Sequence, residues 1–229
     1  MSLATRAPGP ELMDAEDLDP GTYRAVLHDL ARVNTVTMAR RPTLRFLDSV
    51  MRGRSTLRLL DVGFGDGDML RSIARWAKAR GIVAQLVGID LNPNSAGIAA
   101  AQTGRDMPID YRTGDYAALA GQEWDVIASS LVAHHMSEAE LIAFLRFMER
   151  EARVGWFVND LHRHRFAHAG YPLLAQAARW HPIVRHDGRL SIARSFRPAE
   201  WRELLAAANI SAAKIERRFP FRLCVARRR

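Results

Sequence analysis

The sequence contains very little cysteine, and this shortage excludes one way of holding a fold together. A single cysteine, Cys224, cannot form a disulfide within the chain, so the fold must be held by packing alone, as is usual in a reducing cytoplasm. Long hydrophobic runs are also missing, because none approaches the roughly 18 residues of a membrane-spanning helix. The acidic first segment lacks the charged and then apolar pattern of a secretory leader. We therefore expect a cytoplasmic protein with no membrane span.

Lysine is nearly absent too: Lys78 and Lys214 are the lysines among 33 basic residues, which leaves 31 arginines. Against 25 acidic residues, the formal net charge is +8. Arginine binds carboxylates and phosphates through a fork of parallel hydrogen bonds, so this excess permits an anionic partner. Basic runs such as Arg227–Arg229 are usually solvated surface, however, and no RNA-recognition motif accompanies them. The composition therefore does not favour a nucleic acid as the partner.

The order of the segments predicts one domain with additions at its front. The length of 229 residues and the 48% of hydrophobic residues suit a single core. Residues 1–20, with three prolines and few apolar side chains, predict a flexible N-terminal arm. Apolar residues recur at helical spacing over 21–34 and 44–51, so residues 21–56 should form N-terminal helices. The main domain should span residues 57–229.

Within the main domain, short apolar runs alternate with helical segments, which is typical of an α/β fold with a mostly parallel sheet. The alternation stops in residues 160–197, which hold five of the eight histidines and form a predicted insertion near the end of the sheet. The next helix should begin at Pro198. The expected strands are 57–62, 83–89, 108–111, 124–128 and 156–158, followed by an antiparallel hairpin of 213–217 and 222–226.

A glycine-rich turn follows the first of these strands and opens a helix. Gly63, Gly65 and Gly67 alternate with other residues, so the backbone can bend tightly and no side chain separates it from a ligand. The spacing differs from the Gly-x-Gly-x-x-Gly of dinucleotide sites, and no lysine follows it as in a phosphate-binding P-loop. Asp66 and Asp68 would repel a pyrophosphate. The turn therefore favours a ligand that carries positive charge.

Two further acids follow neighbouring strands. Asp90 ends the second strand, where a carboxylate can accept hydrogen bonds from ribose hydroxyls. Asp115, with Tyr116 beside it, follows the third strand and could receive an adenine amino group. Taken singly, each acid could equally cap a helix or a turn. Their combination with the glycine-rich turn, in this chain order, favours a nucleoside-containing cofactor.

The glycine-rich turn with its preceding Asp61, together with Asp90 and Asp115, resembles the class I S-adenosylmethionine-dependent methyltransferases, from about residue 57 to the C-terminus. The resemblance implies a Rossmann-like α/β fold: a seven-stranded, mostly parallel sheet with helices on both faces, an N-terminal helical extension and an insertion after strand 5. It also implies S-adenosyl-L-methionine as cofactor. Segments 11–14 and 159–163 resemble, more narrowly, bacterial small-molecule methyltransferases of polyketide and quinone-type pathways. The implied cofactor-binding residues are Asp61, Gly63, Phe64, Gly65, Asp66, Gly67, Asp90, Leu91, Asn92, Gly114, Asp115, Tyr116, Ser130 and Leu131.

Methyl transfer from a sulfonium mainly requires an acceptor atom held in line, and it requires a base only where that atom carries a proton. His135, after the fourth strand, is the first candidate base, and His162, after the fifth, is the second. His134 is a weaker candidate, and each histidine could instead cap a helix or fill a gap in the core. The histidines of 160–197 match no zinc spacing and lie among arginines, so no metal is expected.

These observations predict an enzyme that transfers a methyl group from S-adenosylmethionine to a small-molecule acceptor. The acceptor would be a hydroxylated or aromatic metabolite of secondary or quinone-like metabolism, bound on the side of the insertion 160–197. Two alternatives are methylation of RNA or another nucleic acid, and a non-catalytic methyltransferase-like binding protein. The acceptor, the methylated atom and the oligomeric state stay open.

Overall fold

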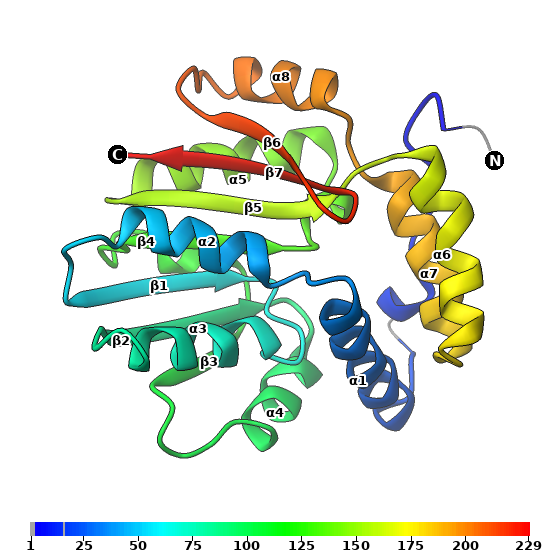
Figure 1. Ribbon diagram of the computed structural model, residues 1–229, viewed down its shortest axis with the longest axis horizontal. Coiled ribbons are helices and arrows are strands. Elements are labelled where there is room, and N and C mark those ends of the chain that lie inside the picture. The colour runs from blue at the N-terminus through cyan, green and yellow to red at the C-terminus, as the bar shows by residue number, and fades with distance from the viewer. Residues whose placement is uncertain (1–2, 16) are drawn as a thin grey trace.

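The computed structural model describes residues 3–15 and 17–229, and it contains a seven-stranded sheet (Figure 1). The strands are β1 (Thr56–Val62), β2 (Val83–Asp90), β3 (Ile109–Thr113), β4 (Val126–Ser130), β5 (Gly155–Leu161), β6 (Lys214–Arg218) and β7 (Arg222–Arg228). Their order across the sheet is β3-β2-β1-β4-β5-β7-β6. The first five pair in parallel, and the final hairpin pairs antiparallel to β5. The predicted mostly parallel sheet with an antiparallel hairpin at its edge is confirmed.

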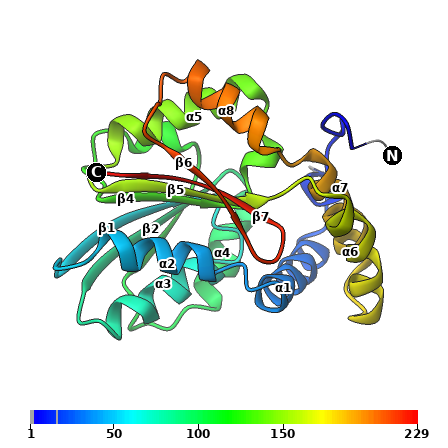
Figure 2. The same cartoon turned by 45° about the horizontal axis from the view of Figure 1, so that its top comes forward.

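Helices cover both faces of the sheet, as expected (Figures 1 and 2). One face carries α2 (Arg41–Val50), α3 (Asp68–Lys78) and α4 (Pro93–Ala101), and the other carries α5 (Glu138–Glu151) and α8 (Pro198–Ala207). Each set of helices encloses its own layer of buried apolar side chains, with Leu70 of α3 in one layer and Phe144 of α5 in the other. Helices on both faces bury most residues of the central strands β1 and β4, which is why these strands are largely apolar.

The helix ends follow the signals in the sequence. The Ser137 hydroxyl accepts the N–H of Glu140 at 3.3 Å, and the Glu140 carboxylate accepts the N–H of Ser137 at 2.8 Å, so a reciprocal cap begins α5. Pro198 is the first residue of α8, as predicted. Asn209, with φ of +62°, ends that helix in the left-handed conformation.

Three helices lie beyond the carboxyl ends of the parallel strands, at the right of Figure 1: α1 (Pro20–Val36), α6 (Arg165–Ala177) and α7 (Pro182–Arg194). They pack on one another through Val26 of α1, Ala175 of α6 and Val184 of α7. The segment 160–197, predicted as an insertion, contains the end of β5 and the helical pair α6 and α7, which together with α1 encloses this edge of the sheet. None of the helices in the described ranges combines the length and the apolar character needed to cross a bilayer.

The arm expected at residues 1–20 lies against the body of the protein in its described part. The Arg6 guanidinium donates hydrogen bonds of 2.7–3.0 Å to three backbone carbonyl oxygens, those of His134, Met136 and Arg194. A short 3-10 helix, η1 (Leu12–Asp14), then precedes α1, and Glu11 beside it is 4% exposed. The arm thus carries polar side chains into the interior.

Candidate active site

A cavity of about 810 Å³ opens beyond the carboxyl ends of the parallel strands, between the glycine-rich turn, α1 and the α6–α7 pair. Small-molecule sites commonly enclose about 300–1,000 Å³, so this cavity has room for more than one ligand. In an open α/β sheet, this edge is where ligands bind. The predicted cofactor residues other than Gly67 all line the cavity: Asp61, Gly63, Phe64, Gly65, Asp66, Asp90, Leu91, Asn92, Gly114, Asp115, Tyr116, Ser130 and Leu131.

The glycines of the turn have two different tasks. At Gly63 and Gly67 the backbone has φ of +76° and +78°, and a side chain would overlap Val132 or Tyr111 respectively. Gly67 therefore packs against β3 and does not reach the cavity. At Gly65, with φ of +56°, the nearest atom to an added Cβ would be a methyl carbon of Leu27 at 3.8 Å. The space in front of Gly65 belongs to the cavity.

Two acids of the turn are neutralised by arginines. Asp66 forms an ion pair with Arg71 at 2.9 Å, and Asp68 forms one with Arg40 at 2.7 Å. The sequence alone suggested that these two acids set the charge preference of the turn. Because both are paired, that preference must come from other carboxylates.

Asp61 and Asp90 line the cavity, and no basic side chain in the described ranges lies within ion-pair distance of either. Asp61 is 1% exposed, and its Oδ1 has no hydrogen-bond partner in that part of the chain. Burial, reinforced by the charges of Asp68 and Asp90, raises the pKa of Asp61 well above its usual range. The Asp90 carboxylate accepts the N–H groups of Gly65 and Asn92, each at 2.9 Å, and burial raises its pKa as well. A cationic ligand would compensate the buried negative charge of both carboxylates.

Asp115 and Tyr116 line a further part of the wall. The Asp115 Oδ1 accepts the N–H of Ala117 at 2.7 Å and caps the short helix η2 (Tyr116–Leu119), which leaves Oδ2 for another donor. The Tyr116 ring packs against two phenylalanines of α5, with ring centroids 4.8 and 4.9 Å apart. Its position is therefore fixed by the core, and its exposed part forms a flat apolar section of the cavity wall.

Five buried polar atoms of cavity-lining residues have no hydrogen-bond partner in the described part of the chain: Asn34 Oδ1, Asp61 Oδ1, Ser130 Oγ, and Nε and Nη1 of Arg222. Buried polar groups nearly always have a partner, so a ligand is expected to supply one. Carbonyl and carboxylate oxygens accept hydrogen bonds, and Asp61 also favours positive charge. The amino, hydroxyl and sulfonium groups of S-adenosylmethionine meet these demands, so the residues fit that cofactor.

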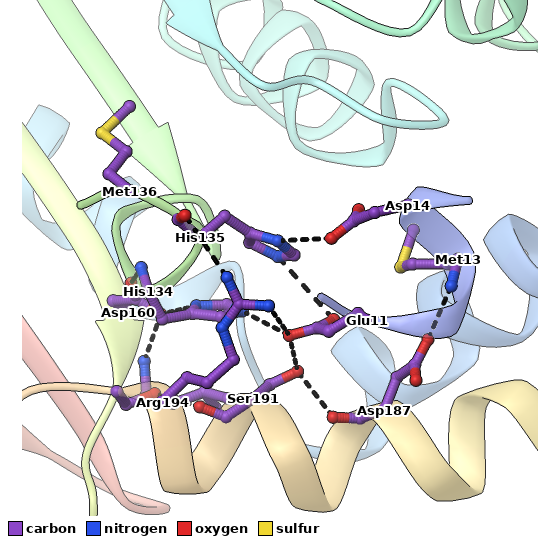
Figure 3. Close-up of polar contacts among 12 residues, drawn as sticks. Glu11, Met13, Asp14, His134, His135, Met136, Asp160, Asp187, Ser191 and Arg194 are labelled. Atoms are coloured by element: carbon purple, nitrogen blue, oxygen red, sulfur yellow. Dashed lines mark hydrogen bonds and ion pairs between the residues drawn. The ribbon is translucent and has the colours of Figure 1, made fainter. Parts of the chain in front are cut away.

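Two histidines follow β4 in the short helix η3 (Ala133–His135), and both line the cavity (Figure 3). His134 is 2% exposed. Its Nδ1 lies 2.7 Å from Oδ1 of Asp160, and its Nε2 lies 3.6 Å from Oε1 of Glu11. Burial lowers the pKa of His134, but the two carboxylates outweigh burial and raise that pKa to about 9. The imidazole of His134 is therefore held firmly by its neighbours.

Two acids of the N-terminal arm complete this cluster. His135 Nδ1 lies 3.1 Å from Oδ2 of Asp14, and His135 Nε2 lies 3.8 Å from Oε2 of Glu11. The Ser191 hydroxyl of α7 donates to Oε1 of Glu11 at 2.8 Å. Burial alone would raise the pKa of Glu11, but the histidines hold it below its usual range. Neither acid follows a strand or belongs to the glycine-rich turn, and only the resemblance of segment 11–14 pointed to the arm.

His162, the second candidate base, does not line the cavity. It follows β5, with its ring centroid 5.4 Å from that of His164. Burial and the charge of Arg217 lower its pKa to about 4. The structure brings His134 and His135 together at the cavity and leaves His162 outside it.

The α6–α7 pair supplies the wall opposite the glycine-rich turn. Phe166, Tyr171 and Leu174 of α6 and Ile192 of α7 line the cavity there. Phe166 is 60% exposed, and Phe219, in the turn between β6 and β7, is 80% exposed at the same cavity. This apolar wall suits an aromatic ligand.

Comparison with known proteins identifies the family of the chain. Residues 59–155 match the family profile described as Methyltransferase domain. The ubiquinone biosynthesis O-methyltransferase of Parvibaculum lavamentivorans is 31% identical over 182 residues, which cover 76% of this chain and 69% of that protein. The protein of the same name from Rhizobium etli is 29% identical, and the match covers 67% of this chain and 60% of that relative's length.

Solved methyltransferase structures share the fold. Human N-acetylserotonin methyltransferase in complex with S-adenosylmethionine has a TM-score of 0.65 and 16% identity, covering 97% of this chain and 60% of that chain. Magnesium protoporphyrin IX methyltransferase from Synechocystis has a TM-score of 0.58 and 16% identity, covering 93% of this chain and 88% of that chain. The shared fold and the similarity to the Parvibaculum protein support the family that the glycine-rich turn indicated. The chain belongs to the class I S-adenosylmethionine-dependent methyltransferases.

Proposed function

We propose that this protein transfers a methyl group from S-adenosylmethionine to a hydroxyl group of a small aromatic or quinone-type acceptor. The observation that carries the proposal is a pair of acids, Asp61 and Asp90, that have no ion-pair partner among the described residues and lie in a cavity with a separate apolar wall. The relatives named for ubiquinone biosynthesis O-methylation support the acceptor class. We place the protein in the cytoplasm, where the buried free thiol of Cys224 would stay reduced.

The residues on the side of the glycine-rich turn would hold the cofactor. Asp90 would accept hydrogen bonds from the ribose hydroxyls, and Asp61 would accept from the ammonium group of the methionine part. Asp115 and Tyr116 would meet the adenine. When bound, S-adenosylmethionine supplies a methyl group on a positively charged sulfur, which makes that carbon electrophilic.

The residues on the α6–α7 side would hold the acceptor. Phe166, Tyr171 and Leu174 would bind its apolar body and exclude water. Glu11 and His135 stand at the polar end of this space, where the acceptor hydroxyl would be oriented and its proton withdrawn. Holding the oxygen in line with the methyl group supplies much of the rate enhancement in such a displacement.

Calorimetric titration with S-adenosylmethionine tests the cofactor assignment. Asp90→Ala should weaken binding by tenfold or more, because hydrogen bonds to a charged group contribute about 1.5–3 kcal/mol. Asp110→Ala is the matched control, since Asp110 is an exposed acid on the neighbouring strand β3 that pairs with Arg112. Absence of binding by the folded wild-type protein would overturn the assignment.

Incubation with methyl-labelled S-adenosylmethionine tests the acceptor class. Phenolic quinone precursors and total RNA are offered in separate reactions. Label in the phenolic fraction is the expected result. Label in RNA alone would contradict the proposed acceptor, and label in neither fraction would contradict the proposed activity.

A further inference from the structure

His134 and His135 both direct their Nε2 atoms towards the carboxylate of Glu11. His134 Nε2 lies 3.6 Å from Oε1 of Glu11, and His135 Nε2 lies 3.8 Å from Oε2. One ligand atom from each of the three residues lies within 4.8 Å of the other two. A small inward movement would bring these atoms around a single ion, since metal ligands stand roughly 2 Å from a zinc ion.

The opposite ring nitrogen of each histidine has its own carboxylate (Figure 3). Asp160 lies 2.7 Å from Nδ1 of His134, and Asp14 lies 3.1 Å from Nδ1 of His135. A proton on Nδ1, donated to the carboxylate, leaves the lone pair of Nε2 directed towards Glu11. Metal-binding histidines almost always have such a partner on the other nitrogen. The hydroxyl of Ser191 orients Glu11 in the same way, at 2.8 Å.

Carboxylates outnumber guanidinium groups around the cluster. Within 4.0 Å of the three residues stand the carboxylates of Asp14 and Asp160 and two guanidinium groups, that of Arg194 at 3.9 Å from Glu11 and that of Arg6 at 3.0 Å from the His134 carbonyl. Counting Glu11 itself, three carboxylates therefore face two guanidinium groups around the imidazoles. Glu11 and His134 are nearly excluded from water, so an ion bound between them would be shielded from solvent.

We propose that Glu11, His134 and His135 form a binding site for a divalent transition-metal ion of the zinc type. Two imidazole nitrogens and one carboxylate are ligands that zinc prefers, whereas magnesium and calcium favour all-oxygen sites. The three residues line the cavity, so the remaining coordination positions face the acceptor space. A cation there lowers the pKa of an acceptor hydroxyl that approaches it, and the proton leaves to solvent. This role, unlike the ion binding itself, rests on the proposed function.

Titration of metal-free protein with Zn²⁺ by calorimetry, and with Co²⁺ by visible absorption, tests the site. We expect one ion per chain and the ligand-field bands of cobalt bound to nitrogen and oxygen. Glu11→Gln and His135→Gln should each weaken binding by tenfold or more. Asp14→Asn should weaken binding less, because Asp14 acts through His135. His28→Gln, a substitution of an exposed histidine on α1, should bind as the wild type does.

Equal affinity in the wild type and in folded Glu11→Gln would overturn the site. Glu11→Gln and His135→Gln roughly keep the size of the original side chains, and thermal unfolding shows whether each variant is folded. Binding of S-adenosylmethionine and methyl transfer are measured with and without the metal. Full methyl transfer by metal-free protein would overturn the role of the ion, whereas failure to bind S-adenosylmethionine would overturn the proposed function while leaving the metal site intact.

Discussion

Asp61 combines near-complete burial with an oxygen that has no hydrogen-bond partner in the described ranges. Such a group reduces stability unless a ligand satisfies it. The neighbouring Asp66 and Asp68 do not share this property, because arginines pair with both. Among the acids of the turn, Asp61 is therefore the one whose replacement should separate stability from ligand binding.

Asp61→Asn should raise the free energy of unfolding at neutral pH by about 2 kcal/mol and weaken the binding of S-adenosylmethionine. The pKa of Asp61 is raised in the folded state, so its favourable contribution is present below the unfolded-state pKa and is lost as pH rises. The advantage of the asparagine variant should therefore grow between about pH 4 and pH 7. Urea unfolding without cofactor measures this difference, and an advantage that does not change with pH would contradict it.

Local spacing made part of the site predictable at the level of single residues. Asp90 and Asp115 each follow a strand directly, so their place at the edge of the sheet depends on the strand pattern alone. Glu11 could not be assigned in this way, because its partners His134 and His135 are remote in sequence and only tertiary packing brings them together. The same holds for Arg40, which neutralises an acid of the turn from the start of α2.

At the level of elements, the strands were more predictable than the two helices of the insertion. Strand β4 begins at Val126 and not at the expected residue 124, because Trp124 lies in the preceding loop and donates its indole N–H to the carbonyl of Leu119 at 2.9 Å. The helices α6 and α7 contain Pro172 and Gly188, which weaken a helical pattern. Packing between the two helices outweighs these local preferences.

Gly188 should be required for the contact between α6 and α7. A side chain at this position would overlap the Tyr171 ring, whose hydroxyl is held by the carbonyl of Val184 at 2.7 Å. Gly188→Ala should therefore lower the free energy of unfolding by about 1–3 kcal/mol. Gly97→Ala, in α4 with open space around it, should raise that energy by up to about 1 kcal/mol. Chemical unfolding of both variants decides, and a stabilising Gly188→Ala would refute the packing argument.

The junction between β5 and α6 should be sensitive to acid through His162. Its pKa falls from 6.5 to about 4 on folding, so the folded state binds fewer protons than the unfolded state between these values. The stability that depends on neutral His162 is present above pH 6.5 and is lost as pH falls to about 4. His162→Gln should remove this loss, which is about 3 kcal/mol at most. Between pH 7 and pH 4 the melting temperature of the wild type should fall more steeply than that of His162→Gln, and parallel curves would refute the effect.

At the level of the whole molecule, one wall of the cavity comes from a single stretch of the chain and the other wall comes from several segments that are remote in sequence. The cofactor side is built from residues 61–131, whereas the other side comes from the arm, α1 and the insertion 160–197. The first side can be recognised from sequence motifs because its residues follow successive strands along the chain. The second side depends on how α1, α6 and α7 pack, which local sequence does not specify.

Arg6 should anchor the arm to the rest of the molecule. Its guanidinium bonds three backbone carbonyls and lies 3.9 Å from the centre of the Phe196 ring. Arg6→Ala should lower the free energy of unfolding by about 2 kcal/mol, since hydrogen bonds from a charged group are among the stronger ones. Arg24→Ala, at an exposed position of α1, is the control. Equal unfolding energies for the two variants would show that the arm contributes little.

The described start of the arm, where the Leu3 carbonyl accepts from Arg163, and the end of β7 lie on opposite sides of the molecule (Figure 1). The antiparallel β7 ends with Arg228 beside Gly155, at the start of β5, whereas the arm leads directly to Glu11. A polyhistidine purification tag on the N-terminus would place additional imidazoles close to the proposed metal ligands, where they would compete for the ion. A tag on the C-terminus is separated from the cluster by the length of the sheet. Metal titrations on this protein therefore call for a C-terminal tag, or for an N-terminal tag that is removed before the measurement.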